Sequence, residues 1–276
     1  MKNKLLVVLL SILPCTVFGA PHFQKVLVIV FENTDFGDAL KQPYFNSLVK
    51  EGSLLTNYHA LTHPSQGNYI SMIAGSLLGV RDDKPVDLSG NHLGDLLEEK
   101  GKSWKAYAED YPGQCFLGKT SGRYARKHVP FLSFTNVTSH ADRCARVVNA
   151  SEFSRDVANG NLPDYSLYIP NLDNDGHDTG VAYGDKWLRK NMDAFLHSKD
   201  FPKDLLVVIT FDESSHNSDN KIYMLLWGNS VLPGSTSASN YNHYNLLRTI
   251  EDNLLLGSLG RNDQTAVSFS GIWKNE

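Results

Sequence analysis

Two short polar stretches follow directly after long apolar runs, and their side chains could bind a cation. Asp212 and Glu213 follow residues 205–211, and Glu32 and Asn33 follow residues 25–31. Carboxylate and amide oxygens are the ligands that hard cations prefer in proteins. If the two runs are strands of one sheet, both stretches reach the edge where such sheets bind ligands. The sequence therefore predicts a shared cation site, and solvated acids at ordinary strand exits are the alternative.

Ser65 stands directly after Pro64, at the predicted start of a helix. Free backbone N–H groups and the dipole at a helix N-terminus favour an anion, so a serine there could attack a phosphate held by the same groups. A nearby cation would lower the pKa of the serine hydroxyl and activate it. The alternative is a serine that only caps the helix, which is worth about 1 kcal/mol.

Two histidines have positions that suit acid–base chemistry. His177 lies in an acid-rich loop after the predicted strand 165–169, where neighbouring carboxylates would raise its pKa. It could hold a phosphoryl oxygen or protonate a leaving group, although the aspartates of this loop also suit an ordinary turn. His243 opens a predicted helix over residues 243–255, where it could cap the helix or reach the site.

The apolar runs also predict the elements that must position these groups. A run without polar alternation is typical of a central strand covered on both faces, as in parallel sheets. We expect an α/β fold with a mostly parallel central sheet sandwiched between helices, and 276 residues suffice for one such domain. Further strands are predicted at 53–58, 103–108, 165–169 and 221–227, and helices at 43–49, 71–75, 92–100, 181–198 and 243–255.

Composition and the amino terminus limit the partner and the compartment. With 26 basic and 30 acidic residues the chain has no basic footprint for nucleic acid, so we expect a small partner. A basic start, an apolar stretch over residues 5–13 and small residues up to Gly19 predict a signal peptide over residues 1–19 and a mature domain over 20–276. The apolar stretch is too short to span a bilayer comfortably. We expect export without a stable membrane anchor, and a retained anchor is the alternative.

Residues 109–148 show no clear periodicity and contain Cys115 and Cys144. In an oxidising compartment these two cysteines are expected to form a disulfide, with two free thiols as the alternative. The segment is predicted to be a long, disulfide-stapled insertion over the sheet edge, and long loops in compact domains are often functional. Its basic group could line a phosphate entrance or form a solvated loop face: Arg123, Arg126, Lys127 and His128.

The chain resembles the phosphoesterase family that contains secreted acid phosphatases and bacterial phospholipases C, within the alkaline phosphatase superfamily. Four stretches carry the resemblance in order: Phe31-Glu32-Asn33-Thr34-Asp35, Thr62-His63-Pro64-Ser65-Gln66-Gly67-Asn68-Tyr69, Pro170-Asn171-Leu172-Asp173-Asn174-Asp175-Gly176-His177-Asp178 and Thr210-Phe211-Asp212-Glu213. Residues 111–116 and 126–131 look most like the compact fungal acid phosphatases. The likeness covers nearly all of the mature chain.

This resemblance implies a divalent metal ion, of open identity, beside a nucleophilic serine. The implied metal ligands are Glu32, Asn33, Ser65, Asp212 and Glu213; the implied catalytic residues are Ser65, His177 and His243; and the implied phosphate contacts are Asn33, His63, His177 and His243. Asp175 matches the family less closely. Gly67 stands where the family usually has proline. Glu213 replaces a histidine of the two-zinc members, which favours a single, oxygen-rich metal site.

The predicted activity is that of a phosphomonoesterase. Ser65 would attack phosphorus in line, a histidine would protonate the leaving alcohol, and water would cleave the phosphoseryl enzyme. A requirement for a protonated histidine would give activity at mildly acidic pH. The alternatives are a phosphodiesterase or phospholipase C on the same scaffold, or a non-catalytic exported binding protein. A sulfatase is disfavoured because the Cys-x-Pro-x-Arg signature is absent.

Overall fold

The computed structural model describes residues 21–215 and 219–275. The predicted signal peptide over residues 1–19 therefore lies outside the described residues. Within the described part of the chain, none of the helices has both the length and the apolar character needed to cross a membrane.

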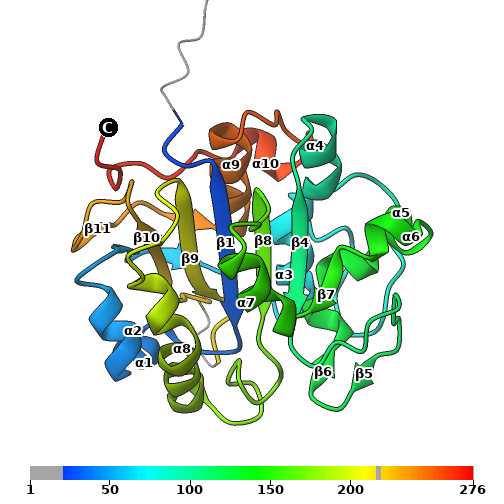
Figure 1. Ribbon diagram of the computed structural model, residues 1–276, viewed down its shortest axis with the longest axis horizontal. Helices are drawn as coiled ribbons and strands as arrows, with labels where there is room; N and C mark the ends of the chain where they lie inside the picture. Colours follow the sequence, from blue (N-terminus) through cyan, green and yellow to red (C-terminus); the bar gives the residue numbers. More distant parts are fainter. Residues whose placement is uncertain (1–20, 216–218, 276) are drawn as a thin grey trace, which may run out of the picture.

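A mixed sheet forms the centre of the molecule and has eight strands among the described residues (Figure 1). Across the sheet the strands are β11 (Ser235–Ser237), β2 (Ser53–Leu55), β10 (Met224–Gly228), β9 (Leu205–Phe211), β1 (Lys25–Phe31), β8 (Tyr165–Ile169), β4 (Trp104–Ala108) and β7 (Val147–Asn149). Of these described strands, β10 alone runs antiparallel to its neighbours. The expected mostly parallel α/β sheet is thus confirmed.

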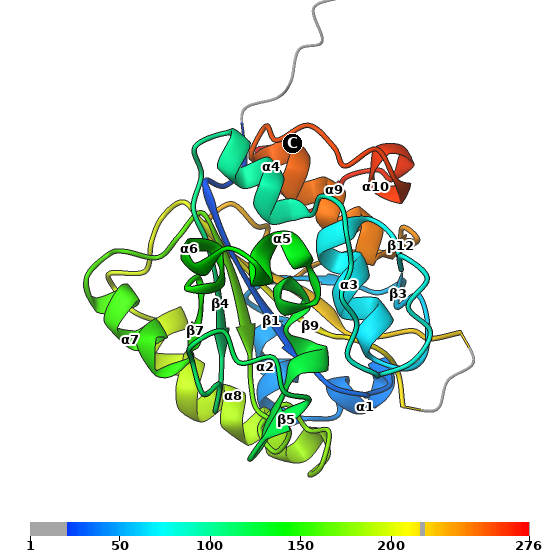
Figure 2. The ribbon, with the colours of Figure 1, turned by 90° about the vertical axis from the view of Figure 1, so that its right-hand side faces the viewer.

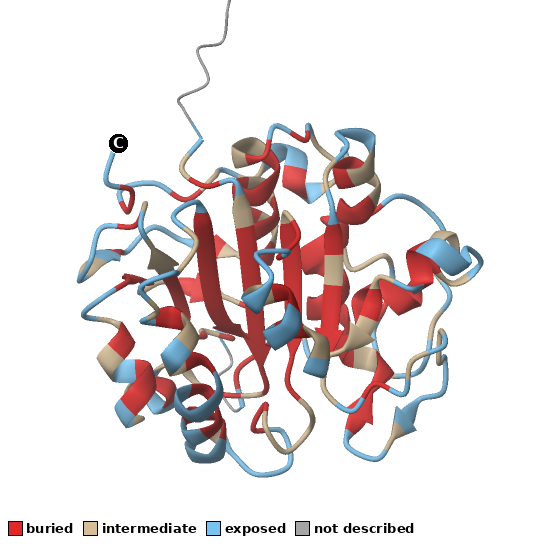
Figure 3. Cartoon of the chain, viewed as in Figure 1, coloured by how far each residue is buried: buried red, intermediate tan, exposed pale blue. Residues whose placement is uncertain are grey.

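Helices cover both faces of this sheet (Figure 2). On one side lie α7 (Ser151–Ala158) and α8 (Val181–Leu196), with α2 (Pro43–Leu48) packed against α8; on the other lie α3 (Gln66–Ala74) and α9 (His243–Asn253), with α4 (Leu93–Glu99) packed against α3. The strands between the two layers are buried along most of their length (Figure 3). Burial on both faces explains why the central strands are apolar without alternation.

An aromatic cluster supports the carboxyl ends of the two central strands. The ring of Phe31 lies 5.2 Å from Phe45, 5.6 Å from Phe211 and 5.8 Å from Trp187. These rings join β1 and β9 to α2 and α8. Close-packed interiors resist displacement, so this packing limits the movement of the strand ends that precede the acidic residues.

The strand register brings the polar stretches to the same level of the sheet. Phe31 pairs with Phe211 in the parallel ladder, so Glu32 and Asp212 leave adjacent strands side by side. The backbone N–H of Asp212 donates to the Phe31 carbonyl at 2.9 Å. On the other side of β1, the N–H of Glu32 donates to the carbonyl of Asp175, beyond β8, at 3.0 Å. Three neighbouring strand exits thus meet.

The segment over residues 109–148 lies beside the β7 edge of the sheet (Figure 1). It folds into short elements: β5 (Thr120–Ser121), β6 (Tyr124–Ala125), the 3-10 helices η1 (Arg126–His128) and η2 (Pro130–Ser133), α5 (Thr135–Thr138) and α6 (Ala141–Cys144). A disulfide joins Cys115 to Cys144, as the sequence predicts.

Most predicted helices and strands recur within two or three residues. The strand expected over 53–58 is instead divided into β2 and β3 (Tyr58–His59), and β3 pairs with β12 (Tyr241–Asn242) outside the main sheet. Two short helices complete the fold, α1 (Phe36–Leu40) and α10 (Asn262–Thr265).

Candidate active site

Ser65 stands at the first position before α3, but its side chain does not cap the helix. The hydroxyl oxygen lies 3.0 Å from Glu32 Oε2 and 3.4 Å from Glu213 Oε1, and the residue is buried. The first helical N–H, that of Gln66, instead donates to Asp83 Oδ1 at 3.0 Å. The Ser65 side chain makes no capping hydrogen bond to the helix, so a purely capping role does not explain this serine.

Gly67 follows in the first turn of α3. A Cβ at this position would lie 2.8 Å from the Thr62 methyl group, so a larger residue would require the Thr62 side chain to shift. The family that the chain resembles usually has proline here. In this chain the absence of a side chain at Gly67 leaves room for the Thr62 methyl group.

The predicted metal ligands form one hydrogen-bonded cluster. The backbone N–H of Asn33 donates to Asp212 Oδ1 at 3.2 Å, and its side-chain amide donates to Glu213 Oε1 at 3.1 Å. Asn68 from α3 donates to the other Glu213 oxygen at 3.3 Å. Asn33 has a φ of 38°, a left-handed conformation that asparagine tolerates better than most residues. This conformation lets the backbone N–H and the side-chain amide of Asn33 both face the acids that follow β9.

His128 and Asp175 extend the cluster on the far side of Glu32. His128 Nε2 lies 3.3 Å from Glu32 Oε1, and His128 Nδ1 lies 3.5 Å from Asp175 Oδ2. The Tyr69 hydroxyl donates to Glu32 Oε1 at 2.5 Å, and the Tyr69 and His128 rings stack with their centroids 5.0 Å apart. From the sequence, His128 was predicted among the basic residues of the insertion and within the stretch 126–131 that resembles fungal acid phosphatases, and Asp175 in a turn or as a weaker family match; neither was predicted to be a metal ligand.

Burial dominates the electrostatics of these acids. It raises the pKa of Glu32 well above its usual range, and the charges of Asp212 and Asp175 add to the effect. Burial likewise raises the pKa of Asp212 to about 7 and, together with the charge of Asp212, that of Glu213 to about 8. Several carboxylates cannot all be ionised in one buried volume unless positive charge accompanies them.

The donor set fits a hard divalent cation. Three buried oxygens of the cluster have no hydrogen-bond donor among the described residues: Asn33 Oδ1, Asp175 Oδ2 and Asp212 Oδ2. Glu32, His128 and Asp175 also place one potential ligand atom each within 4.8 Å of one another. Buried polar atoms without partners are rare, and carboxylate and amide oxygens are suitable ligands for such an ion. This cluster could therefore bind a metal.

His63 and His177 lie at the rim of the cluster. His63 Nδ1 is 2.9 Å from Glu213 Oε2, and its side chain is half exposed. His177 Nδ1 is 2.7 Å from Asp178 Oδ1, and the backbone N–H of His177 donates to Asp175 Oδ1 at 2.8 Å. Both rings reach solvent beside the buried acids. A contact with phosphate remains a prediction for both, and their positions are compatible with it.

His243 lies beneath the cluster, where its ring is completely buried. Its Nε2 donates to the backbone carbonyl of Asp212 at 2.9 Å, and its Nδ1 accepts from the Tyr58 hydroxyl at 2.9 Å. Burial lowers the pKa of His243 to about 4. Both ring nitrogens are therefore occupied within the protein. The prediction that His243 contacts phosphate or protonates a leaving group does not fit this position.

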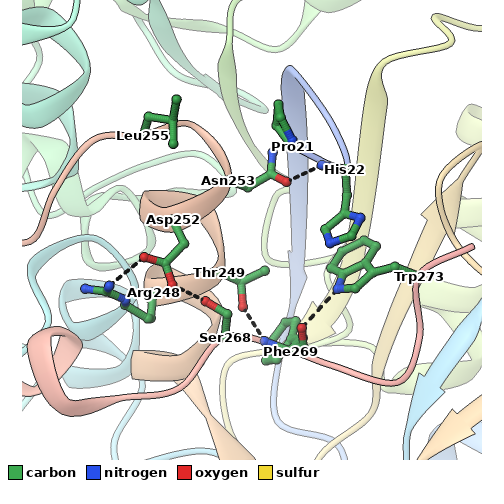
Figure 4. A pocket seen from close by; sticks show the side chains of 10 residues that line it. All are labelled: Pro21, His22, Arg248, Thr249, Asp252, Asn253, Leu255, Ser268, Phe269 and Trp273. Carbon is green, nitrogen blue, oxygen red and sulfur yellow. Dashed lines mark hydrogen bonds and ion pairs between the residues drawn. The ribbon is translucent and has the colours of Figure 1, made fainter. Parts of the chain in front are cut away.

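A pocket of about 230 Å³ lies at the opposite, amino end of β1 (Figure 4). His22 stacks on Trp273 there with a centroid distance of 4.5 Å, and Arg248 pairs with Asp252 at 2.6 Å. None of the residues predicted to do chemistry lines this pocket. The acid cluster at the carboxyl ends of the strands is therefore the candidate active site.

Comparison with known proteins shows the family. A family model described as "Phosphoesterase family" matches residues 37–256, a range that includes Ser65, His177 and Asp212 and begins after Glu32. A probable acid phosphatase of Kluyveromyces lactis is 36% identical over 257 residues, covering 88% of this chain and 61% of that protein. A phosphatidylinositol-3-phosphatase of Mycobacterium tuberculosis is 35% identical over 236 residues, covering 84% of this chain and 77% of that protein.

The fold has solved counterparts. A protein in the alkaline phosphatase superfamily from Vibrio parahaemolyticus superposes with a TM-score of 0.62 at 14% identity, covering 92% of this chain and 72% of that one. The present chain spans about three fifths of the length of the fungal acid phosphatases that it matches.

Proposed function

The chain belongs to the phosphoesterase family, and from this premise we propose that it is an exported acid phosphatase that hydrolyses phosphate monoesters through a phosphoserine intermediate. The fungal relatives named acid phosphatases support the reaction class, and so does the relative named phosphatidylinositol-3-phosphatase. The predicted signal peptide supports export.

One observation carries the proposal: the Ser65 hydroxyl points to buried carboxylates rather than to the backbone of its own helix. In the proposed reaction Ser65 Oγ forms a bond to phosphorus while the bond to the ester oxygen breaks. The ionised form of Glu32 accepts the hydroxyl proton on Oε2, which lies 3.0 Å away. Water then attacks the phosphoserine and gives up a proton to His177, the bond from phosphorus to Ser65 Oγ breaks, and the proton held by Glu32 returns to Oγ as inorganic phosphate leaves.

The residues that fit a divalent ion are Glu32, Asn33, Ser65, Asp212 and Glu213. His128 and Asp175, on the far side of Glu32, offer further ligand atoms. A bound ion would neutralise the buried acids and withdraw charge from the phosphoryl oxygens. Asn33 and Asn68 orient the Glu213 carboxylate through both of its oxygens. His243 holds the main chain of Asp212, so we assign it a positioning role.

We assign proton delivery to His177. Its Nδ1 lies 2.7 Å from Asp178 Oδ1, which fixes the ring, and its Nε2 lies 3.5 Å from Lys127 Nζ at the exposed rim of the cluster. A histidine held in this way can protonate the departing alcohol and later deprotonate the water that cleaves the intermediate. His63, on the other side of Glu213, would bind a phosphoryl oxygen.

The direct test compares p-nitrophenyl phosphate with bis-p-nitrophenyl phosphate. Initial rates with the mature chain from pH 4 to 9 should be higher for the monoester, and Ser65→Ala should abolish release from it. Faster release from the diester would assign the chain to phosphodiesterases of the same scaffold. Metal binding without release from either ester would indicate a binding protein.

A further inference from the structure

Lys127 differs from the two arginines of the insertion because its charged group lies next to His177, at the rim of the candidate active site. Its Nζ is 2.8 Å from Asp83 Oδ2 and 3.5 Å from His177 Nε2, and its side chain is only 16% exposed. Arg123 instead pairs with the loop acids Asp173 and Asp178.

Arg126, which precedes Lys127 in η1, is also committed elsewhere. It pairs with Asp87 at 2.9 Å and donates to backbone carbonyls of the surrounding segments. The sequence left open whether this basic group lines a phosphate entrance or forms a loop face. Arg123 and Arg126 bind loop acids and backbone carbonyls, whereas Lys127 lies at the rim of the candidate active site.

Asp83 connects Lys127 to the nucleophile helix. One oxygen of Asp83 accepts from the N–H of Gln66 at 3.0 Å, and the other accepts from Lys127 at 2.8 Å. The Asp83 carboxylate therefore bridges the Lys127 ammonium and the backbone of Gln66, the residue that follows Ser65. On the other side of the lysine lies His177, whose Nε2 is 3.5 Å from Lys127 Nζ.

The charge of Lys127 reaches the acid cluster. Lys127 directly precedes His128, whose Nε2 lies 3.3 Å from Glu32 Oε1 in that cluster. The ion pair between Lys127 Nζ and Asp83 Oδ2, at 2.8 Å, holds the ammonium in its charged form. Lys127 is thus a fixed positive charge beside the reaction centre.

We propose that Lys127, held by Asp83 and lying next to His177, selects phosphate monoesters by pairing with the second negative charge that a monoester carries and a diester lacks. The inference rests on the proposed function and adds its substrate selectivity. One additional ion pair near a protein surface changes affinity by about tenfold or more. That factor would favour the dianion of a monoester over the monoanion of a diester.

A structural role for Lys127 is the competing explanation, since the ion pair with Asp83 also steadies the start of α3. Asp83→Asn distinguishes the two. The asparagine oxygen can still accept from the Gln66 N–H, whereas the charge that holds Lys127 is lost. Lys84→Gln is the matched control, because Lys84 pairs with the neighbouring Asp82 at 2.8 Å and is exposed.

The experiment measures kcat/KM on p-nitrophenyl phosphate and on bis-p-nitrophenyl phosphate, together with the Kd of inorganic phosphate by calorimetry on the metal-loaded protein. For Lys127→Gln we expect the monoester value and the phosphate affinity to fall about tenfold or more, and the diester value to change less than about threefold. Lys127→Arg should recover part of the loss, Asp83→Asn should show a smaller loss of the same kind, and Lys84→Gln should match the wild type.

Equal losses on both esters with an unchanged phosphate Kd would overturn the inference and leave Lys127 a structural residue. If the wild type binds phosphate but cleaves neither ester, the proposed function fails, and the phosphate Kd of Lys127→Gln still decides the role of the lysine in binding. A wild type that binds no phosphate would contradict both proposals.

Discussion

Replacing Glu251 with glutamine should stabilise the protein, and more so as the pH rises. Glu251 lies in α9 and is completely buried, and neither of its carboxyl oxygens has a hydrogen-bond donor among the described residues. Burial, with a further contribution from the charge of Asp263, raises its pKa from 4.5 to about 9. Asp263 is itself held by the backbone N–H groups of Leu259 and Arg261.

The sign and size follow from the linkage between protonation and folding. The pKa of Glu251 is higher in the folded protein than in the unfolded chain. The contribution of this carboxyl group to stability is therefore fully present below pH 4.5 and is lost as the pH rises through about 9. At pH 7 the unfolded chain has released a proton that the folded chain retains. This pH is about 2.5 units above the pKa of Glu251 in the unfolded chain, and each unit is worth about 1.4 kcal/mol. The raised pKa of Glu251 therefore lowers the free energy of unfolding at pH 7 by about 3 kcal/mol. Glutamine has nearly the shape of the protonated acid and no proton to lose.

The assay is urea unfolding, or the melting temperature, of wild type and Glu251→Gln at pH 5, 6, 7 and 8. We expect little difference near pH 5, a gain of about 3 kcal/mol at pH 7 and a corresponding rise in Tm of about 6–12 °C. Glu99→Gln is the control, because Glu99 in α4 is exposed and its replacement should gain nothing. Curves for Glu251→Gln that stay parallel to the wild type at every pH would refute the reasoning.

Three further predictions concern the disulfide, Tyr69 and the cation. Cys115→Ser with Cys144→Ser should lower the free energy of unfolding by about 3–4 kcal/mol, because the disulfide closes a loop of 29 residues; unchanged urea unfolding would contradict this. Tyr69→Phe removes the hydroxyl donor of buried Glu32 and should lower stability by about 1–3 kcal/mol, measured in the same way; an equal midpoint would show that Glu32 needs no donor there. Removal of divalent ions by a chelator should lower Tm, and added metal should restore it, since a bound ion stabilises the folded state; a Tm indifferent to both would argue against the metal site.

The sheet was predictable because its central strands are apolar on both faces. The runs over residues 25–31 and 205–211 became β1 and β9, and their register brought Glu32 and Asp212 together. This part of the site depends on local pattern and on the known geometry of parallel sheets. It therefore needed no information about distant contacts.

His128 and His243 show where sequence reasoning stops. His128 lies in η1, within a segment that has no hydrophobic periodicity, and its role depends on Tyr69 and Glu32, which are far away in the sequence. For His243 the helix start was predicted, but the direction of the ring was not. That direction depends on Tyr58 in β3 and on the main chain of Asp212.

Ser65 illustrates an ambiguity that only tertiary contacts resolve. A serine before a helix is a common cap, and sequence alone could not exclude that role. Asp83 bonds to the first N–H of α3, and the Ser65 hydroxyl faces Glu32. The deciding contact is with Glu32, which lies 33 residues upstream of Ser65, where no spacing rule would point to it.

The most direct measurement of the central claim compares Ser65→Ala with Ser71→Ala on p-nitrophenyl phosphate. Ser71 is a buried serine of the same helix whose hydroxyl donates to the Asn68 carbonyl, so it controls for the loss of a buried hydroxyl. Each variant is assayed after unfolding curves show that it is folded, and acid-quenched wild type is examined for a phosphorylated peptide. A phosphoserine mechanism predicts a loss of about 10³-fold or more for Ser65→Ala, near-normal rates for Ser71→Ala and phosphate on Ser65. Near-normal turnover by folded Ser65→Ala would contradict it.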